Sequence, residues 1–388
     1  GLITIVLGSA VLLLACPLLS YSSSLKEYAV LICAYTLASN LHSLCAQYVR
    51  AEGKTGLFAL QGILNTALVI FFNILFLLFF KLGVLGYVMS VVAADGLCTL
   101  YLVLHEKLWT VCTPDPEKPL WKSMLRYSIP LIPTTIFWWI TSVSDRYMIA
   151  YFLGTEANGL YAVACKIPTV LTLLSTIFLE AWQFSAIEEA TGDREVHIRF
   201  YGQVWSAFLS AMVMAGSVLI VLCRVEIRLL SAARYFEAWK YVPVLSIAMV
   251  FSAFASFMGS VYVVTEKSRL SFRTTLWGAL ANILLNLLLI PRIGIQGAAI
   301  ATLASYVLCF SIRAVSARKL IPFPLRFTRL VFSAALLGIQ ILLCFVNSPI
   351  QPIGQIAALL LLLVANRKPF VQTVQQLLHV VSSRTQRK

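Results

Sequence analysis

The chain has 388 residues, of which 60% are hydrophobic and only 12% are charged, and its mean hydropathy is +0.87. A soluble domain carries about 25% charged residues and cannot hide so much apolar surface in one core. The composition therefore excludes a soluble enzyme and predicts a protein embedded in a membrane. The formal net charge of +14 also fits nucleic-acid binding, so the distribution of the basic residues decides between the two.

Apolar segments long enough to cross a bilayer recur along the whole chain. A spanning helix needs about 20 apolar residues, and the strands of a membrane barrel would alternate apolar and polar residues. Runs such as 64–80 and 283–290 do not alternate, so we predict an all-α membrane protein of about twelve transmembrane helices. The expected spans are 2–20, 29–49, 58–80, 84–104, 128–152, 159–184, 203–223, 242–264, 272–290, 295–315, 329–347 and 350–365.

The basic residues lie preferentially in alternate loops. With the amino terminus in the cytoplasm, the inner loops, the adjoining span ends and the tail hold 21 of the 30 Lys and Arg residues, including Arg313 at the end of one span. This asymmetry follows the positive-inside rule and predicts that both termini are cytoplasmic. The charge therefore indicates topology, and we expect no nucleic-acid partner. The predicted cytoplasmic loops are 50–57, 105–126, 186–202, 265–272 and 316–328.

The nine cysteines are scattered singly and form no CxxC motif or His/Cys cluster, so we expect no metal site, no disulfide framework and no cofactor. The segment Gly53-Lys54-Thr55 is similar to the end of a phosphate-binding loop. That motif requires an earlier glycine, where this chain has Tyr48, and a preceding strand. An ATPase site is therefore excluded.

Two stretches of the chain resemble each other. Each ends one span, turns through a short basic loop, forms a second span and turns at glycine into a third. Such weak symmetry is typical of transporters built from two repeated bundles; chance similarity between apolar helices is the alternative. The matched positions, 209 to 214 residues apart, are Tyr48 and Tyr262, Val49 and Val263, Glu52 and Glu266, Asn73 and Asn282, Gly83 and Gly294, and Gly86 and Gly297.

The repeat also predicts the domain organisation. The second bundle begins near Tyr127, so a repeat of about 212 residues places the start of the first bundle about 85 residues before Gly1. We expect the first bundle to lack two helices here, either because the chain is a fragment or because the protein dispenses with them. The expected parts are an incomplete bundle of four helices (1–110), a loop (111–126), a six-helix bundle (127–315), two accessory helices (316–366) and a cytoplasmic tail (367–388), with amphipathic interfacial segments at 224–241 and 369–388.

A specific pattern occupies residues 126–168. It consists of Arg-Tyr-Ser-Ile-Pro-Leu-Ile-Pro at 126–133, Ser-Asp-Arg-Tyr-Met-Ile at 144–149, Phe-Leu-Gly at 152–154 and Gly-Leu-Tyr-Ala-Val-Ala-x-Lys-Ile-Pro at 159–168. This pattern resembles the polysaccharide biosynthesis and oligosaccharide flippase family of the multidrug/oligosaccharidyl-lipid/polysaccharide (MOP) exporter superfamily. The Arg-Ala-Glu-Gly-Lys turn at 50–54 is similar to an inner turn of that family. The resemblance covers nearly the whole chain.

The resemblance implies two six-helix bundles around a central cavity, followed by two accessory helices. It also implies alternating access in the bacterial inner membrane, with a polyprenyl-pyrophosphate-linked oligosaccharide, such as an O-antigen unit for lipopolysaccharide, as the substrate. The implied partners are this lipid-linked substrate, membrane lipids and a glycan polymerase with its export machinery. The sequence departs from the family pattern in the first two helices, which help to form the cavity.

Charged side chains inside spans are costly and normally face a cavity or a partner. Asp145 and Arg146 lie in the predicted span 128–152, and Lys166 lies in the span 159–184. We predict that Arg146 and Lys166 hold the pyrophosphate, because unpaired phosphate charges are costly in a low-dielectric cavity. We expect Asp145 to keep one of the two bases charged when no substrate is bound. The alternative is an interfacial pair that reaches the lipid headgroups.

Four more polar residues are candidates for coupling to an ion or for lining the cavity. Asp95 and Glu180 are carboxylates that would exchange a coupling ion. The alternatives are a partner on a neighbouring helix for Asp95 and headgroup contact for Glu180. Asn40 and His42 lie on a polar side of span 29–49, although a single histidine is more often structural.

Aromatic residues and prolines suggest further roles. Trp138 and Trp139 are candidates for stacking on sugar rings, but adjacent helical residues cannot both face one cavity, so we expect at least one to pack against protein. Pro130, Pro133 and Pro168 are expected to bend their helices, and such bends are plausible pivots for gating.

Three functions remain open on the residues alone. The first is a flippase for lipid-linked oligosaccharides, and the second is a multidrug or lipid-linked peptidoglycan-precursor exporter of the same superfamily. The third is a membrane glycosyltransferase or polymerase, which would need an acidic or Arg-rich catalytic loop on the outer face. The outer loops are short and lack paired carboxylates, so we favour a transporter over an enzyme.

Overall fold

The computed structural model describes residues 28–110, 118–189, 194–346 and 351–367, together with four positions between residues 5 and 11. The predicted span 2–20 and the predicted tail therefore lie almost entirely outside the described residues. The chain divides into two compact units, Gly1–Glu117 (unit 1) and Lys118–Lys388 (unit 2). Each unit has its own set of packed helices.

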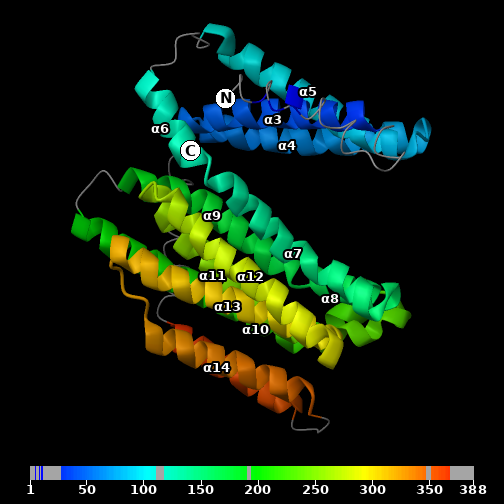
Figure 1. Ribbon diagram of the computed structural model, residues 1–388, viewed down its shortest axis with the longest axis vertical. Helices are drawn as coiled ribbons and strands as arrows, with labels where there is room; N and C mark the ends of the chain where they lie inside the picture. Colours follow the sequence, from blue (N-terminus) through cyan, green and yellow to red (C-terminus); the bar gives the residue numbers. More distant parts are fainter. Residues whose placement is uncertain are drawn as a thin grey trace, which may run out of the picture. The chain divides into compact units, whose positions relative to one another are not determined.

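All regular structure among the described residues is helical, as predicted (Figure 1). Unit 1 contains α3 (Ala29–Ala51), α4 (Thr55–Asn73), the π-helical segment η1 (Ile74–Phe79), α5 (Gly83–Glu106) and the 3-10 helix η2 (Leu108–Thr110). Unit 2 contains α6 (Lys118–Ser128), α7 (Leu131–Leu153), α8 (Thr155–Lys166), α9 (Thr169–Glu189), α10 (Arg194–Leu230), the 3-10 helix η3 (Ala233–Lys240), α11 (Val242–Val264), α12 (Ser268–Ile293), α13 (Ile295–Leu320), α14 (Phe327–Cys344) and the helix Gln351–Arg367.

Seven of the described helices are long and apolar enough to cross a membrane, and the bent pair α8–α9 makes an eighth when it is counted as one span. The helix Gln351–Arg367, at the last predicted span, is apolar but shorter. The helices α3 and α7 are 23 residues long and coincide with predicted spans, but they are more polar and are not among the seven. The chain is thus a multi-pass membrane protein, and the number of twelve spans stays a prediction.

In unit 2, α11 is the most enclosed of these apolar helices, since 78% of an 18-residue stretch of it is buried, compared with 28% for α12. The helices α9, α10 and α13 pack against α11, α12 packs against α13 and α7, and α14 packs against α10 (Figure 1). Buried aromatic rings fill the space beside α11: the Trp205 ring lies 5.2 Å from both Phe254 and Phe257. Because lipid offers no hydrophobic drive between helices, close packing of this kind holds the unit together.

The helix α10 is longer than the predicted span 203–223. It runs for 37 residues and includes residues 224–230, so the predicted interfacial segment 224–241 is wrong except for η3. The physical reason is that Arg224 finds partners inside the fold. Its guanidinium lies 4.1 Å from the Trp239 ring centroid and donates a 2.9 Å hydrogen bond to the Cys344 carbonyl. The helix therefore continues past this charge.

The predicted span 159–184 is broken. The helices α8 and α9 meet at 43°, with Ile167 and Pro168 between them. Proline lacks an N–H group and clashes with the preceding turn, so the predicted bend at Pro168 is confirmed. Pro130 instead separates α6 from α7, and Pro133 lies in the first turn of α7, where a proline costs no helical hydrogen bond.

Within each unit, loops predicted to be cytoplasmic lie at the same end. In unit 1, Lys54 before α4 forms an ion pair with Glu106 at the end of α5. In unit 2, the start of α10 and the ends of α11 and α13 surround one pocket. These contacts agree with the predicted sharing of a face inside each unit.

The helix triplets α3–α4–α5 and α11–α12–α13 share a packing pattern. In both, the third helix packs against the first two, which contact each other much less. Both connecting turns contain a residue with positive φ, Gly53 at 75° and Glu266 at 55°. The turns also share their backbone hydrogen bonds, from Glu52, Gly53 and Lys54 to Tyr48, Arg50 and Val49, and from Thr265, Glu266 and Lys267 to Val261, Val263 and Tyr262. This agreement supports the predicted repeat.

The structural register of the repeat differs from the sequence match at one place. These hydrogen bonds are equivalent at a separation of 213 residues, so Tyr48 corresponds to Val261 and not to Tyr262. Gly83 and Gly294, with φ of 56° and 64°, correspond at 211 residues as predicted. Unit 1 thus has two extra residues between its turns. The π-helical η1 lies in this stretch, and π-helical hydrogen bonds span one residue more than α-helical ones.

Candidate functional site

A buried polar cluster of unit 2 surrounds Asp145 on α7. This side chain is 4% exposed and accepts hydrogen bonds from Tyr161 Oη at 2.7 Å, Asn286 Nδ2 at 2.6 Å and Thr302 Oγ1 at 2.5 Å. The donors belong to α8, α12 and α13, so one carboxylate joins four helices. All three donors are neutral groups. Among the described residues, the structure records no ion pair between Asp145 and a basic side chain.

Helical spacing explains why the sequence assembles this cluster. Asn282 and Asn286 are four residues apart and therefore share one face of α12. Asn286 Nδ2 also donates to Asn282 Oδ1 at 3.1 Å, and Ser144 Oγ donates to the same oxygen at 2.9 Å. Buried polar groups in a membrane must find partners inside the protein, so each side chain fixes the next. Within the described part of the chain, Asn286 Oδ1 is buried without a hydrogen-bond partner beside the Asp145 carboxylate.

The predicted substrate residues Arg146 and Lys166 lie outside this cluster. Arg146 is exposed and approaches the Cys165 thiol, because adjacent helical residues point in different directions. Lys166 is the last residue of α8 and is exposed at the 43° break. The expected contact of Asp145 with one of these bases is therefore not observed, because neutral donors from three other helices occupy the carboxylate.

Unit 1 contains a second buried carboxylate, Asp95 on α5, which is 5% exposed. It accepts hydrogen bonds from Ser39 Oγ of α3 at 2.5 Å and Asn65 Nδ2 of α4 at 2.9 Å. His42 Nδ1 lies 3.4 Å from Asp95 Oδ1, and His42 Nε2 lies 2.7 Å from Gln61 Oε1. The structure thus brings the candidates Asp95 and His42 together, with partners for Asp95 on both neighbouring helices.

The other candidates do not join these clusters. Asn40 is exposed and donates to a backbone carbonyl one turn earlier at 2.7 Å, and Glu180 is exposed on α9. Trp138 and Trp139 diverge, as expected for neighbours on a helix. Trp138 stacks on Tyr306 with ring centroids 5.9 Å apart, whereas Trp139 is 60% exposed.

A basic residue that we assigned to the cytoplasmic end of a span is enclosed in unit 2. Arg313 on α13 is 3% exposed. Its Nε donates to Thr274 Oγ1 at 3.0 Å, its Nη2 to Thr275 Oγ1 at 2.8 Å and its Nη1 to the Ala255 carbonyl at 2.9 Å. The structure records no acidic partner for it among the described residues. Arg313 is therefore an enclosed cation held by neutral acceptors.

Two features make room for this cation. The guanidinium carbon lies 5.4 Å from the Trp138 ring centroid, which is within the range of cation–π attraction. A Cβ atom at Gly259 would lie 2.7 Å from Nη1, so only glycine fits there without movement. The predicted span 295–315 placed Arg313 at its end, but α13 continues to Leu320. The available signal was a charge between apolar residues inside a span.

Comparisons with known proteins bear on these sites. Residues 1–183 match the model of a family described as polysaccharide biosynthesis protein, which confirms the resemblance predicted from 126–168. An uncharacterised membrane protein of Methanocaldococcus jannaschii is 23% identical over 256 residues, which cover 62% of this chain and 59% of that protein. The chain thus spans less than two thirds of the length of this relative.

Solved structures of transporters share the fold. The MATE transporter VcmN of Vibrio cholerae in its bent form is 16% identical with a TM-score of 0.69, covering 82% of this chain and 76% of that one. A MOP superfamily transporter from Pyrococcus furiosus is 12% identical with a TM-score of 0.67, covering 83% and 77%. The lipid II flippase MurJ in an inward closed conformation is 15% identical with a TM-score of 0.62, covering 96% and 82%.

Proposed function

We propose that this chain, a member of the polysaccharide biosynthesis family of the MOP superfamily, is a flippase for polyprenyl-pyrophosphate-linked oligosaccharides in the bacterial inner membrane. The family match over residues 1–183 carries the proposal, and the fold shared with the lipid II flippase MurJ supports it. The protein would work by alternating access of two bundles, with both termini in the cytoplasm. It would move its substrate without chemical change.

In this proposal, Arg146 and Lys166 bind the pyrophosphate. Both side chains are exposed although they belong to α7 and α8, and a charge within a span needs water, a headgroup or an anion beside it. Lys166 ends α8 at the break before α9. Substrate sites of transporters typically lie at such discontinuous helices. The broken helix therefore favours Lys166 as the main phosphate contact.

Asp145 is our proposed coupling group. A buried carboxylate without a basic partner is costly inside a bilayer, so binding of a proton or a small cation would stabilise it. Neutralising Asp145 would weaken the charge-assisted hydrogen bonds from Tyr161 and Thr302. Tyr161 lies on α8, the same half-helix that ends at Lys166. A change at Asp145 would thereby reach the substrate-binding lysine, and Asp95 is the second candidate for coupling.

A multidrug exporter is the second candidate function. The observation in its favour is that the MATE transporter VcmN matches with a TM-score of 0.69, compared with 0.62 for MurJ. A shared fold does not fix a substrate. The family match favours the glycolipid over the drug.

The test is transport of a fluorescent polyprenyl-pyrophosphate oligosaccharide in proteoliposomes, with an exported dye as the competing substrate. We expect transport of the glycolipid. Arg146→Ala or Lys166→Ala should each reduce it by roughly tenfold or more, because a hydrogen bond to a charged group contributes about 1.5–3 kcal/mol. Lys166→Arg should keep part of the rate. Asp145→Asn should remove the dependence on an ion gradient while substrate binding persists.

The matched control is Lys122→Ala, which removes the same charge from α6, outside the spans. If Arg146→Ala and Lys166→Ala transport as well as this control, both side chains merely contact headgroups. Transport of the dye without the glycolipid would favour the multidrug exporter instead.

A further inference from the structure

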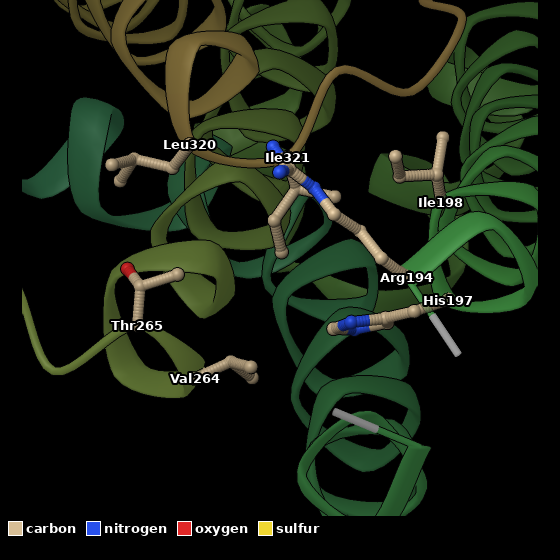
Figure 2. Close-up of a pocket in the computed structure, with 7 residues that line it drawn as sticks. All are labelled: Arg194, His197, Ile198, Val264, Thr265, Leu320 and Ile321. Atoms are coloured by element: carbon tan, nitrogen blue, oxygen red, sulfur yellow. The ribbon is translucent and has the colours of Figure 1, made fainter. Parts of the chain in front are cut away.

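A pocket of about 220 Å³ lies at one end of unit 2, where three helix ends meet. Figure 2 shows its residues, which come from the start of α10, the end of α11 and the end of α13. The volume exceeds what one water needs by more than about tenfold. None of these residues belongs to the Asp145 cluster or to the proposed substrate site. They are Arg194, His197, Ile198, Val264, Thr265, Leu320 and Ile321.

The polar side of the pocket favours an anion. Arg194 extends over the pocket toward Leu320 and Ile321, and the His197 ring points into the same space (Figure 2). Both side chains lie in the first turn of α10, where the backbone N–H groups have no partner within the helix and carry its positive end. The Thr265 hydroxyl donates to the Val261 carbonyl at 2.7 Å, so donors for a ligand come from the α10 side.

The surroundings of the pocket strengthen this preference. In the segments 194–199, 264–269 and 318–321, six side chains are basic and two are acidic. Clusters of one sign raise the local concentration of ions of the other sign. The basic residues are Arg194, Arg199, Lys267, Arg269, Arg318 and Lys319, and the acidic residues are Glu195 and Glu266.

The opposite wall is apolar. Ile198, Val264 and Leu320 line the pocket and are only partly buried. A free inorganic anion gains nothing from such a wall, whereas a phosphate joined to hydrocarbon uses both sides. The pocket also lies at the end of unit 2 that the basic loops predict to be cytoplasmic, where lipid headgroups lie.

We propose that this pocket binds the phosphate group of an anionic phospholipid from the cytoplasmic leaflet. Arg194 and His197 contact the phosphate, and Ile198, Val264 and Leu320 contact the glycerol and the first acyl carbons. One bound lipid would bridge α10, α11 and α13. Since a ligand that binds only the folded state stabilises it, the lipid would hold these three helix ends together.

The test measures lipid binding to the purified protein in nanodiscs of phosphatidylcholine, with phosphatidylglycerol titrated in and bound lipid counted by native mass spectrometry. We expect a preference for phosphatidylglycerol that Arg194→Gln reduces by about tenfold, because a charge-assisted contact is lost. Ile198→Trp fills the pocket without changing charge and should reduce the preference to a similar extent. Thermal unfolding should show that phosphatidylglycerol stabilises the wild type more than either variant.

The matched control is Arg199→Gln, which removes an exposed charge from the same helix outside the pocket. It should keep the preference within about twofold of the wild type, since surface charges act weakly. Equal losses for Arg199→Gln and Arg194→Gln would mean diffuse attraction to the membrane and would overturn the proposal. An unchanged preference in Ile198→Trp would do the same. Binding of inorganic phosphate as tight as that of phosphatidylglycerol would identify a soluble anion as the ligand instead.

Discussion

The triplet α3–α4–α5 of unit 1 encloses the carboxylate of Asp95, whereas the triplet α11–α12–α13 of unit 2 encloses the guanidinium of Arg313. At the 213-residue separation of the first two helices, residues that surround the acid in one unit correspond to residues that surround the base in the other. These equivalent pairs are His42 and Ala255, and Gln61 and Thr274.

This contrast shows which part of the repeat is retained. Backbone hydrogen bonds and positive φ angles recur at both turns, because they depend little on side-chain identity. The enclosed side chains differ, because they determine what each triplet does. A carboxylate beside an imidazole can gain or lose a proton, whereas a guanidinium stays charged in proteins. We infer that unit 1 holds an adjustable charge and that the triplet of unit 2 holds a fixed one.

The largest effect should come from removing the fixed charge. Exchanging a buried ionic group for an apolar one is often neutral or stabilising, and Thr274 and Thr275 keep their own hydrogen bonds to the Ser271 carbonyl. Arg313→Met should therefore leave the melting temperature close to that of the wild type. Transport should nevertheless fall by about tenfold or more, because charged residues inside a membrane normally serve function. The measurements are thermal unfolding and glycolipid transport.

Arg313→Lys is the control, since it keeps the charge but loses the planar donors. It should retain more transport than Arg313→Met. A fully active Arg313→Met would show that the guanidinium only fills space, and the contrast between the two triplets would then concern packing alone.

A smaller effect should separate two equivalent glycines. A Cβ atom at Gly297 would lie 2.5 Å from the Leu289 carbonyl oxygen, whereas at Gly86 the nearest atom, Cβ of Leu82, would lie at 3.0 Å. Gly297→Ala should thus destabilise unit 2 by about 1–3 kcal/mol, as overpacking does. Gly86→Ala should cost much less, because Ala gains about 0.5–1 kcal/mol in a helix. Thermal unfolding of both variants measures the difference, and equal losses would contradict it.

Composition, hydropathy and charge were enough to predict an all-helical membrane protein, because lipid permits few alternatives to helices. The bend at Pro168 was predictable from one residue, since a proline acts on its own helix. The partners of Asp145 were not predictable, because Tyr161, Asn286 and Thr302 are up to 157 residues away in the chain. Their meeting depends on how four helices pack.

The predicted register of the repeat failed for a related reason. Matching Tyr48 with Tyr262 compares side chains, whereas the equivalence of the two turns lies in backbone hydrogen bonds. Arg313 was missed because α13 is longer than its apolar run. A charge counted as part of the cytoplasmic face by spacing therefore proved to be inside the helix packing.

The smallest effect concerns the adjustable charge of unit 1. A neutral His42 ring can donate from Nε2 to Gln61 Oε1, at 2.7 Å, and accept at Nδ1 from Asn65 Nδ2, at 3.2 Å. A second proton would enter at Nδ1, where Asp95 Oδ1 lies 3.4 Å away and is the charged partner, since Gln61 and Asn65 are neutral. Histidine is the side chain that ordinarily changes charge between about pH 5 and 8. The ion pair would tie α3 to α5 as the pH falls.

Lowering the pH from about 8 to about 5 should therefore slow transport by roughly twofold to fivefold, the range expected of a pair that contributes up to about 1 kcal/mol. His42→Gln should remove most of this dependence, because it keeps a polar side chain but takes no second proton. His105→Gln is the control, since His105 is half exposed and lies beside Glu106 at the end of α5. Transport at several pH values in the presence of an ionophore isolates the effect from the proton gradient. A His42→Gln variant that keeps the full dependence would move the adjustable charge away from the Asp95 cluster, and the contrast with Arg313 would then rest on the sign of the charge alone.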